Sequence, residues 1–259
     1  MAVQASLLRN LRRPLELSIG TARLQISFSQ EELYRRALIR YQGFETSDDP
    51  GFFIRLLDSH EVSAPSDFHY EWEGASLRCG DREAVFSGVR HEYALDSLLR
   101  VFLSWTLLPK PGFLLHAATI VRNGRAFVFA GRSGAGKSTL AALAPAGAVM
   151  TDEISLLCAE GGEWRAYSTP FWGEFRAAGK HRHAPLAGIF QLVQAPQNRA
   201  ERISAAEAVR MLLPNVLFFS KEPEANRRLL QTVSAAVEGV ACHRFEFRRD
   251  ASLWEALPA

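Results

Sequence analysis

Residues 131–139 read GRSGAGKST and contain the pattern G-x-x-x-x-G-K-S. In such a loop the glycines let the backbone approach a phosphate closely, so that several N–H groups point at its oxygens. Lys137 is expected to reach the β and γ phosphates, and Ser138 to hold Mg²⁺ through its hydroxyl. The residues expected to bind the phosphates of ATP are Gly131, Arg132, Ser133, Gly134, Ala135, Gly136, Lys137, Ser138 and Thr139.

Two adjacent carboxylates, Asp152 and Glu153, lie in the apolar stretch VMTDEISLL. A carboxylate on a strand beside a phosphate loop usually serves the metal, and a second one suits a general base that accepts a hydroxyl proton. In a continuous strand the two side chains point to opposite faces, so both cannot face the nucleotide equally. The alternative is an acidic pair at a strand end that faces water.

Three further residues are candidates on weaker grounds. His116, in LLHAAT, lies on the strand paired with the one that leads into the loop, and is either packed or catalytic. Glu174, in GEFR, shares a face with Arg176 if that segment is extended. Arg202, in QNRAERIS, either stabilises a transferring phosphate or is an ordinary surface arginine.

The pattern of apolar and turn-forming residues predicts the strands and helices that position these candidates. Two apolar runs, 113–121 and 126–130, flank Asn123-Gly124, the strongest short signal for a β-hairpin. The loop is therefore expected to follow the second strand of a hairpin, and a short helix follows it from Lys137. Later segments alternate between strand and helix, and Ser204 with Glu207 forms a capping box before a helix. We expect an α/β domain over residues 109–259.

Residues 1–108 differ from the remainder of the chain in their pattern of predicted strands and helices. Short strand-like and helix-like segments alternate there, which predicts a smaller α+β region. No catalytic pattern occurs in it, and its role is left open.

Composition narrows the functional classes. The chain has 259 residues, 47% of them hydrophobic and 22% charged, with a net charge of +2. This charge is too small to indicate nucleic acid, and no apolar run approaches the roughly 20 residues that a membrane span needs. The start of the chain lacks a signal-peptide layout, so we expect a cytoplasmic protein. Its three cysteines are far apart and are given no metal role.

Taken in order, these residues resemble the catalytic domain of the HPr serine kinase family, whose fold is similar to that of phosphoenolpyruvate carboxykinase. The resemblance rests on LLHAA, GRSGAGKS, TDE, GEFR and ERIS, and it runs from about residue 113 to residue 207. It implies a mixed-sheet P-loop fold and transfer of the γ-phosphate of ATP to a serine hydroxyl. It also implies that Asp152 or Glu153 is the base, that His116 supports it, that Glu174 is a metal ligand and that Arg202 contacts the phosphate.

Several departures from the family bear on the base and on the acceptor. Glu153 stands where the HPr kinases have aspartate, which leaves the assignment of the base between Asp152 and Glu153 open. The end of the chain differs from their HPr-docking helix. Residues 1–108 show no clear match, and the chain looks more like HPr-kinase-related proteins that accompany peptide-modification systems. The expected acceptor is therefore a protein or peptide serine other than that of HPr, and the family resemblance is compatible with a homo-oligomer.

The leading hypothesis is an ATP- and Mg²⁺-dependent serine kinase. One alternative is an ATP-binding accessory or scaffold module without phosphoryl transfer, and another is a small-molecule kinase or carboxykinase-like enzyme. The sequence has no Asn-Lys-x-Asp stretch for reading guanine and no Ser-Gly-Gly-Gln signature of a transporter ATPase.

Overall fold

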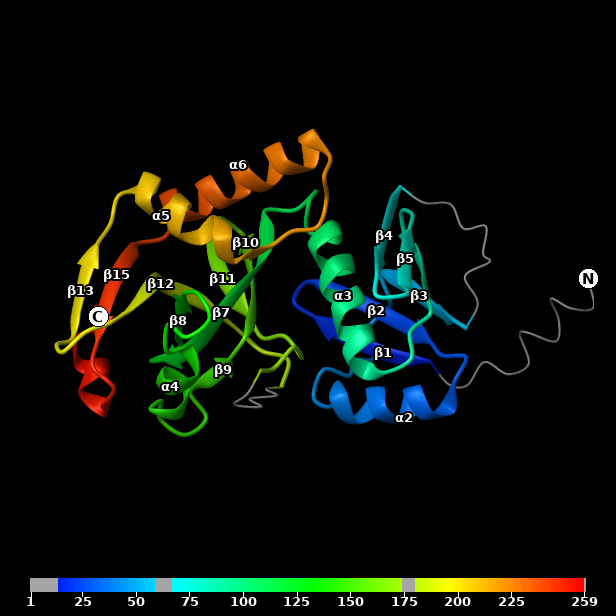
Figure 1. The fold of residues 1–259 in the computed structure, drawn as a ribbon, viewed down its shortest axis with the longest axis horizontal. Coiled ribbons are helices and arrows are strands. Elements are labelled where there is room, and N and C mark those ends of the chain that lie inside the picture. The colour runs from blue at the N-terminus through cyan, green and yellow to red at the C-terminus, as the bar shows by residue number, and fades with distance from the viewer. Residues whose placement is uncertain (1–13, 59–66, 174–179, 259) are drawn as a thin grey trace, which may run out of the picture. The chain divides into compact units, whose positions relative to one another are not determined.

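The structure is a computed structural model that describes residues 14–58, 67–173 and 180–258. The chain divides into two compact units, Met1–Trp105 and Thr106–Ala259, which are described separately. Both contain β-sheet and α-helix, so the molecule is a mixed α/β protein (Figure 1). Among the described residues no helix is long and apolar enough to cross a membrane.

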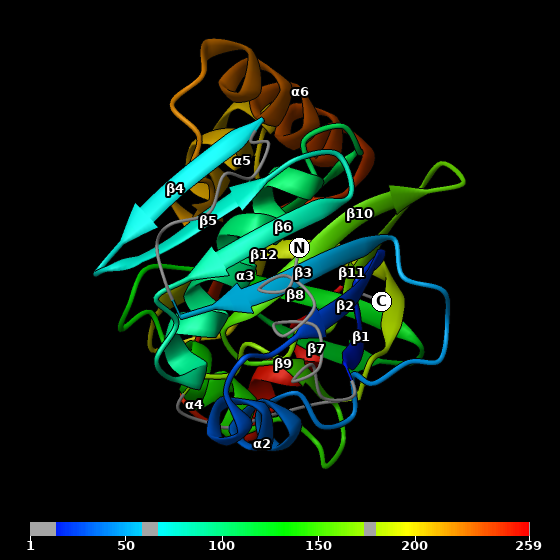
Figure 2. The same ribbon diagram turned by 90° about the vertical axis from the view of Figure 1, so that its right-hand side faces the viewer.

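The N-terminal unit is built on one six-stranded sheet with the order β1-β2-β3-β6-β5-β4 (Figure 2). Neighbouring strands are antiparallel except at β2–β3 and β3–β6, which are parallel. The helix α3 packs on this sheet through Phe102, whose ring contacts Phe52 and Phe86. The elements are β1 (Leu15–Ile19), β2 (Ala22–Ser27), α2 (Glu31–Arg40), β3 (Phe52–Leu57), β4 (Phe68–Trp72), β5 (Ala75–Cys79), β6 (Glu83–Ser87) and α3 (Glu92–Thr106).

A buried ion pair joins helices α2 and α3. Asp96 of α3 accepts hydrogen bonds from Arg40 Nε at 2.9 Å and from the hydroxyl of Tyr41 at 2.8 Å. Both Arg40 and Asp96 are buried. Burial raises the pKa of the Asp96 carboxyl, whereas its bonds to Arg40 and Tyr41 favour the charged form. The ion pair therefore stabilises the packing of α2 against α3, whereas the loss of either partner would leave the other buried and unpaired.

The C-terminal unit contains a nine-stranded sheet with the main order β11-β10-β7-β8-β12-β15-β13. Two short strands, β9 and β14, pair with β7 beside this path. The strands are β7 (Gly112–Arg122), β8 (Arg125–Ala130), β9 (Val149–Thr151), β10 (Ile154–Glu160), β11 (Glu163–Tyr167), β12 (His183–Gln194), β13 (Arg199–Arg202), β14 (Val216–Leu217) and β15 (Cys242–Phe247). The helical elements are α4 (Lys137–Ala142), α5 (Ala205–Leu212), η2 (Leu213–Asn215), α6 (Pro223–Gly239) and η3 (Ala251–Glu255).

Three central strands, β8, β12 and β15, run parallel to one another. Their carboxyl ends therefore reach the same edge of the sheet, where ligands bind in many α/β proteins. The long strand β12 also pairs with β11 through its first residues before it joins β8 at Leu186. The pairings β11-β10-β7-β8-β12-β11 thus form a closed circuit.

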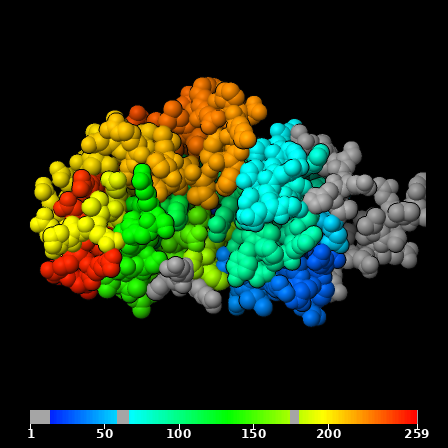
Figure 3. Space-filling view, in the orientation of Figure 1, coloured from blue at the N-terminus to red at the C-terminus, as the bar shows by residue number. Residues whose placement is uncertain are grey.

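The two faces of this sheet are covered by different elements. On one face α5 and α6 pack through residues such as Met211 and Val233. On the other face an aromatic cluster that includes Phe129, Phe190 and Phe245 packs with α4 and η3. Figures 1 and 3 show the C-terminal segment beside α4, where Trp254 Nε1 donates to the carbonyl of Leu143 at 2.8 Å.

The hairpin predicted from Asn123-Gly124 is confirmed. β7 and β8 pair antiparallel up to Arg122 and Arg125, which leaves a two-residue turn. Both turn residues have positive φ, 51° for Asn123 and 75° for Gly124. These are the signs that a type I′ turn requires, and this turn matches the twist of the strands.

The Arg40–Asp96 pair yields a stability prediction. We expect Asp96→Ala to lower the free energy of unfolding by about 3–5 kcal/mol, because it leaves the Arg40 charge buried without its carboxylate. The matched control is Asp48→Ala, which removes an exposed carboxylate paired with Arg23 and is expected to cost at most about 1 kcal/mol. Denaturant unfolding of the full chain measures both, and equal losses would contradict the prediction.

Candidate functional site

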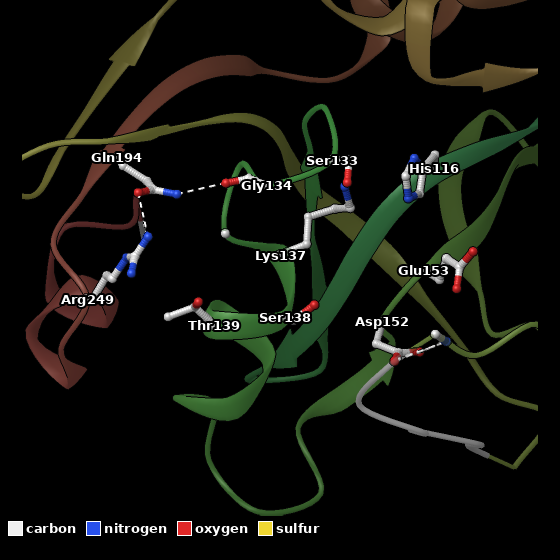
Figure 4. A pocket seen from close by; sticks show the side chains of 12 residues that line it. His116, Ser133, Gly134, Lys137, Ser138, Thr139, Asp152, Glu153, Gln194 and Arg249 are labelled. Atoms are coloured by element: carbon white, nitrogen blue, oxygen red, sulfur yellow. Dashed lines mark hydrogen bonds between the residues drawn. The ribbon is translucent and has the colours of Figure 1, made fainter.

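A cavity of about 570 Å³ opens in the C-terminal unit at the carboxyl edge of the parallel strands. One wall is the glycine-rich loop between β8 and α4 with the first turn of α4 (Figure 4). The lining residues from this segment are Ser133, Gly134, Gly136, Lys137, Ser138 and Thr139.

The loop conformation depends on its glycines. Gly134 and Gly136 have φ values of 79° and 106°, which side chains rarely allow. A Cβ at Gly136 would lie 2.5 Å from the ring of Phe247, and one at Gly131 would lie 2.7 Å from Ala135 Cβ. Gly131 and Gly136 are therefore needed for close packing and Gly134 for its backbone angle. Because glycine has no side chain, the backbone of the loop faces the cavity at Gly134 and Gly136.

Lys137 is the first residue of α4, and only 8% of its surface is exposed. Its ammonium donates to the carbonyl of Gly131 at 2.7 Å. Burial lowers the pKa of Lys137, and the negative charge of Glu153 opposes that shift. A lysine held in this way is a cation with little water around it, and such a cation binds an incoming phosphate strongly.

Asp152 and Glu153 form the opposite wall, together with His116 and Gly173 (Figure 4). The expectation that one strand runs through the acidic pair is wrong. β9 ends at Thr151 and β10 begins at Ile154, and the two acidic residues form a bend between them. Because the bend interrupts the alternation of side chains, both carboxylates line the same cavity.

The bend is held by three buried hydroxyl groups. Ser155 Oγ lies 2.7 Å from Thr119 Oγ1 and 2.6 Å from Thr151 Oγ1, and it donates to the carbonyl of Ala117 at 3.1 Å. A hydroxyl has one proton and two lone pairs, so Ser155 accepts from both threonines while it donates to Ala117. This network joins β7, β9 and β10 on either side of the acidic pair.

The two carboxylates have different surroundings. Asp152 is buried, and its two oxygens accept from the backbone N–H of Gly173 at 3.2 Å each. Glu153 is half-buried, and a Cβ at Gly173 would lie 2.5 Å from its Oε2. Gly173 therefore contacts both acidic residues and leaves room for the Glu153 side chain.

His116 lies on β7 next to the acidic pair. It is opposite Ile154 in the β7–β10 register, and the N–H of Ala117 donates to the carbonyl of Glu153 at 2.9 Å. The side chain of His116 is half-buried and lines the cavity. Its sequence position on the strand paired with β8 was the signal that indicated this placement.

Two lining residues, Gln194 and Arg249, were missed by sequence reasoning. Gln194 ends β12, and Arg249 follows β15. Gln194 Nε2 donates to the carbonyl of Gly134 at 2.8 Å, and Arg249 Nη2 donates to Gln194 Oε1 at 2.7 Å. The pattern alone gave no signal for either residue, because their relevance follows from the parallel pairing of β8, β12 and β15.

The structure does not bring Arg202 to this cavity. Arg202 ends β13 and pairs with His243 near the start of β15, whereas the cavity lies beyond the other end of that strand. At about 3.3 Å per residue, the span from His243 to Phe247 is about 13 Å. Glu174 lies outside the described residues, although its neighbour Gly173 is at the acidic pair.

The donor set is compatible with Mg²⁺. The described residues contain no group of three or more His, Cys, Asp or Glu side chains arranged to hold a metal ion. Mg²⁺ bound with a nucleotide needs only one or two protein oxygens, because phosphates and water supply the others. Ser138 and Asp152 offer such oxygens at the cavity.

Comparison with known proteins gives one family. The family model described as SynChlorMet cassette protein ScmC matches residues 95–228, just over half of the chain. A search of curated proteins gave no match. Among solved structures, the HPr(Ser) kinase/phosphatase from Coxiella burnetii aligns with 14% identity over 48% of this chain and 89% of its own. The TM-score of that alignment is 0.28, too low to support a conclusion. On the strength of the family match, the chain belongs to the ScmC family of SynChlorMet cassette proteins.

Proposed function

We propose that this protein is an ATP-dependent phosphotransferase that moves the γ-phosphate of ATP to a serine hydroxyl of a protein or peptide acceptor. The observation that carries the proposal is the single cavity in which Lys137 and Ser138 face Asp152, Glu153 and His116. A phosphate loop alone would fit many nucleotide-binding proteins. Carboxylates on the opposite wall add a group that can take the proton of an attacking hydroxyl.

In the proposed reaction the serine oxygen forms a bond to the γ-phosphorus. The bond from that phosphorus to the β–γ bridging oxygen breaks, and ADP leaves with the electron pair. The hydroxyl proton passes to a carboxylate of the acidic pair. Lys137 and the backbone N–H groups of the loop stabilise the charge on the phosphates, which is the main contribution of the protein in such transfers.

The surroundings of the carboxylates suggest different roles. Both oxygens of the buried Asp152 accept from the backbone N–H of Gly173, which fixes the orientation of this carboxylate at the cavity. Asp152 therefore suits the metal, together with Ser138. The more exposed Glu153 then suits the proton, with His116 beside it. When bound, Mg²⁺ would neutralise charge on the phosphates.

The acceptor is proposed on separate grounds. The expectation of a protein or peptide serine came from the resemblance described above. The family description as a cassette protein fits an acceptor supplied by another member of the same cassette. Glu174 is retained in the proposal as a further metal ligand because Gly173, the residue before it, contacts both carboxylates.

The test uses ATP labelled on its γ-phosphate, with Mg²⁺, the full chain and a lysate of the source organism. We expect label on one discrete protein or peptide, and its loss with Lys137→Ala or with a chelator. Asp152→Asn is expected to lose transfer and to weaken Mg²⁺-dependent ATP binding. Glu153→Gln is expected to lower transfer at least about a hundredfold, because it removes the proton acceptor. It is expected to weaken ATP binding only slightly, because it also removes a negative charge that favours the protonated form of Lys137.

Glu238→Gln serves as the matched control, because it neutralises an exposed carboxylate on α6. It should transfer phosphate like the unaltered protein. Nucleotide binding without any labelled acceptor would instead support the accessory-module alternative. Full transfer by Glu153→Gln with none by Asp152→Asn would exchange the two proposed roles.

The lowered pKa of Lys137 yields a pH prediction. Burial makes this lysine lose its proton at lower pH than an exposed lysine, whereas bound phosphates favour the protonated form. ATP binding should therefore take up more protons at a pH near the ordinary lysine range than at neutral pH. Calorimetry in two buffers of different ionisation enthalpy measures the uptake. Equal apparent enthalpies at alkaline pH would contradict the prediction.

A further inference from the structure

The cavity has two chemically different ends. The acidic pair and His116 lie on one side of the glycine-rich loop, and Gln194 and Arg249 lie on the other, with Lys137 between them (Figure 4). This separation follows from the sheet. The acidic pair is held next to β7, whereas Gln194 ends β12 and Arg249 follows β15, on the far side of β8.

The basic end is tied directly to the loop. Arg249 donates to the Gln194 side-chain oxygen, and Gln194 donates to the carbonyl of Gly134. The first bond fixes the orientation of the Gln194 amide, so that its NH₂ group faces the loop. A guanidinium has five N–H donors. In the part of the chain that the structure describes, one of those of Arg249 is used, in the bond to Gln194.

The position of Arg249 agrees with a contact to ligand. The side chain of Arg249 is exposed to solvent. It nevertheless lines the cavity, next to the glycine-rich loop. By contrast, Arg248 pairs with Asp250, and Arg244 lies by Glu246 on the strand. Of these three arginines of the C-terminal segment, only Arg249 lines this cavity.

The acidic end fixes which way a nucleotide must lie. The phosphate that is transferred has to meet both the acceptor hydroxyl and the proton acceptor, so it lies toward Asp152 and Glu153. The remaining phosphates and the nucleoside then extend past Lys137 toward Gln194 and Arg249. A cation at that end would contact a part of the nucleotide that ADP and ATP share.

We propose that Arg249 is a nucleotide-binding residue at the nucleoside side of the site, where its guanidinium bonds the phosphate nearest the ribose while Gln194 holds it against the loop. This assignment rests on the function proposed above. It makes the C-terminal segment after β15, which lies beyond the matched residues 95–228, part of the nucleotide site.

The test compares ATP and ADP binding by Arg249→Gln, with Mg²⁺ present, by calorimetry on the full chain. Loss of one charge-assisted hydrogen bond is expected to weaken both nucleotides about tenfold or more, by the same factor. Arg244→Gln is the matched control, because it removes an exposed arginine from the adjoining strand outside the cavity, and it should bind both nucleotides normally. Equal thermal stability of the two variants checks that the fold is intact.

Each other outcome overturns the assignment in a recognisable way. If Arg249→Gln weakens ATP but not ADP, Arg249 contacts the terminal phosphate and the nucleotide lies the other way. If neither nucleotide is affected, Arg249 is no ligand, while the proposed transfer reaction stands. If the unaltered protein binds neither nucleotide, the proposed function fails, and the assignment fails with it.

Discussion

The register of strand β7 is the constraint on which the site depends. On one side Ala117 pairs with Ala130, the residue directly before the glycine-rich loop. On the other side its neighbour His116 pairs with Ile154, the residue directly after the acidic pair. The separation between the loop and the carboxylates is thus fixed by one short segment of β7. A slip of one residue would turn these side chains to the other face of the sheet.

Buried polar groups hold this arrangement where regular pairing stops. The bend at Asp152–Glu153 interrupts the regular strand, and such a break in a buried sheet must be compensated by other hydrogen bonds. The hydroxyls of Thr119, Thr151 and Ser155 lie on both sides of the break. Because all three are buried and Ser155 bonds both threonines, they hold the backbone on either side of the acidic pair.

Local features of the structure could be predicted from the sequence. The turn at Asn123-Gly124 and the capping box of Ser204 and Glu207 have the expected geometry, because each is decided by a few neighbouring residues. The same holds for the helix that starts at Lys137. The glycine-rich loop is recognisable in the sequence because its backbone angles and close contacts require glycine at fixed positions.

Non-local features could not be predicted in this way. The apolar residues around Asp152 and Glu153 continue the alternation of a strand, so the pattern conceals the bend, which depends on hydroxyls from another strand. The sequence pattern indicated Arg202 as a candidate and gave no signal for Arg249. Only the parallel pairing of β12 with β15 shows that the residues after Phe247 reach the cavity, whereas Arg202 lies near the opposite end of β15.

The buried lysine connects the energetics of the loop to its chemistry. The carbonyls of Gly131 and Arg132 accept from the Lys137 ammonium, so its charge is partly satisfied within the loop. The surroundings that lower its pKa also reduce screening by water, which strengthens its attraction for a phosphate. Glu153 acts in the opposite sense by favouring the charged form of Lys137. Glu153 therefore partly offsets the effect of burial on Lys137, in addition to the role proposed for it in accepting a proton.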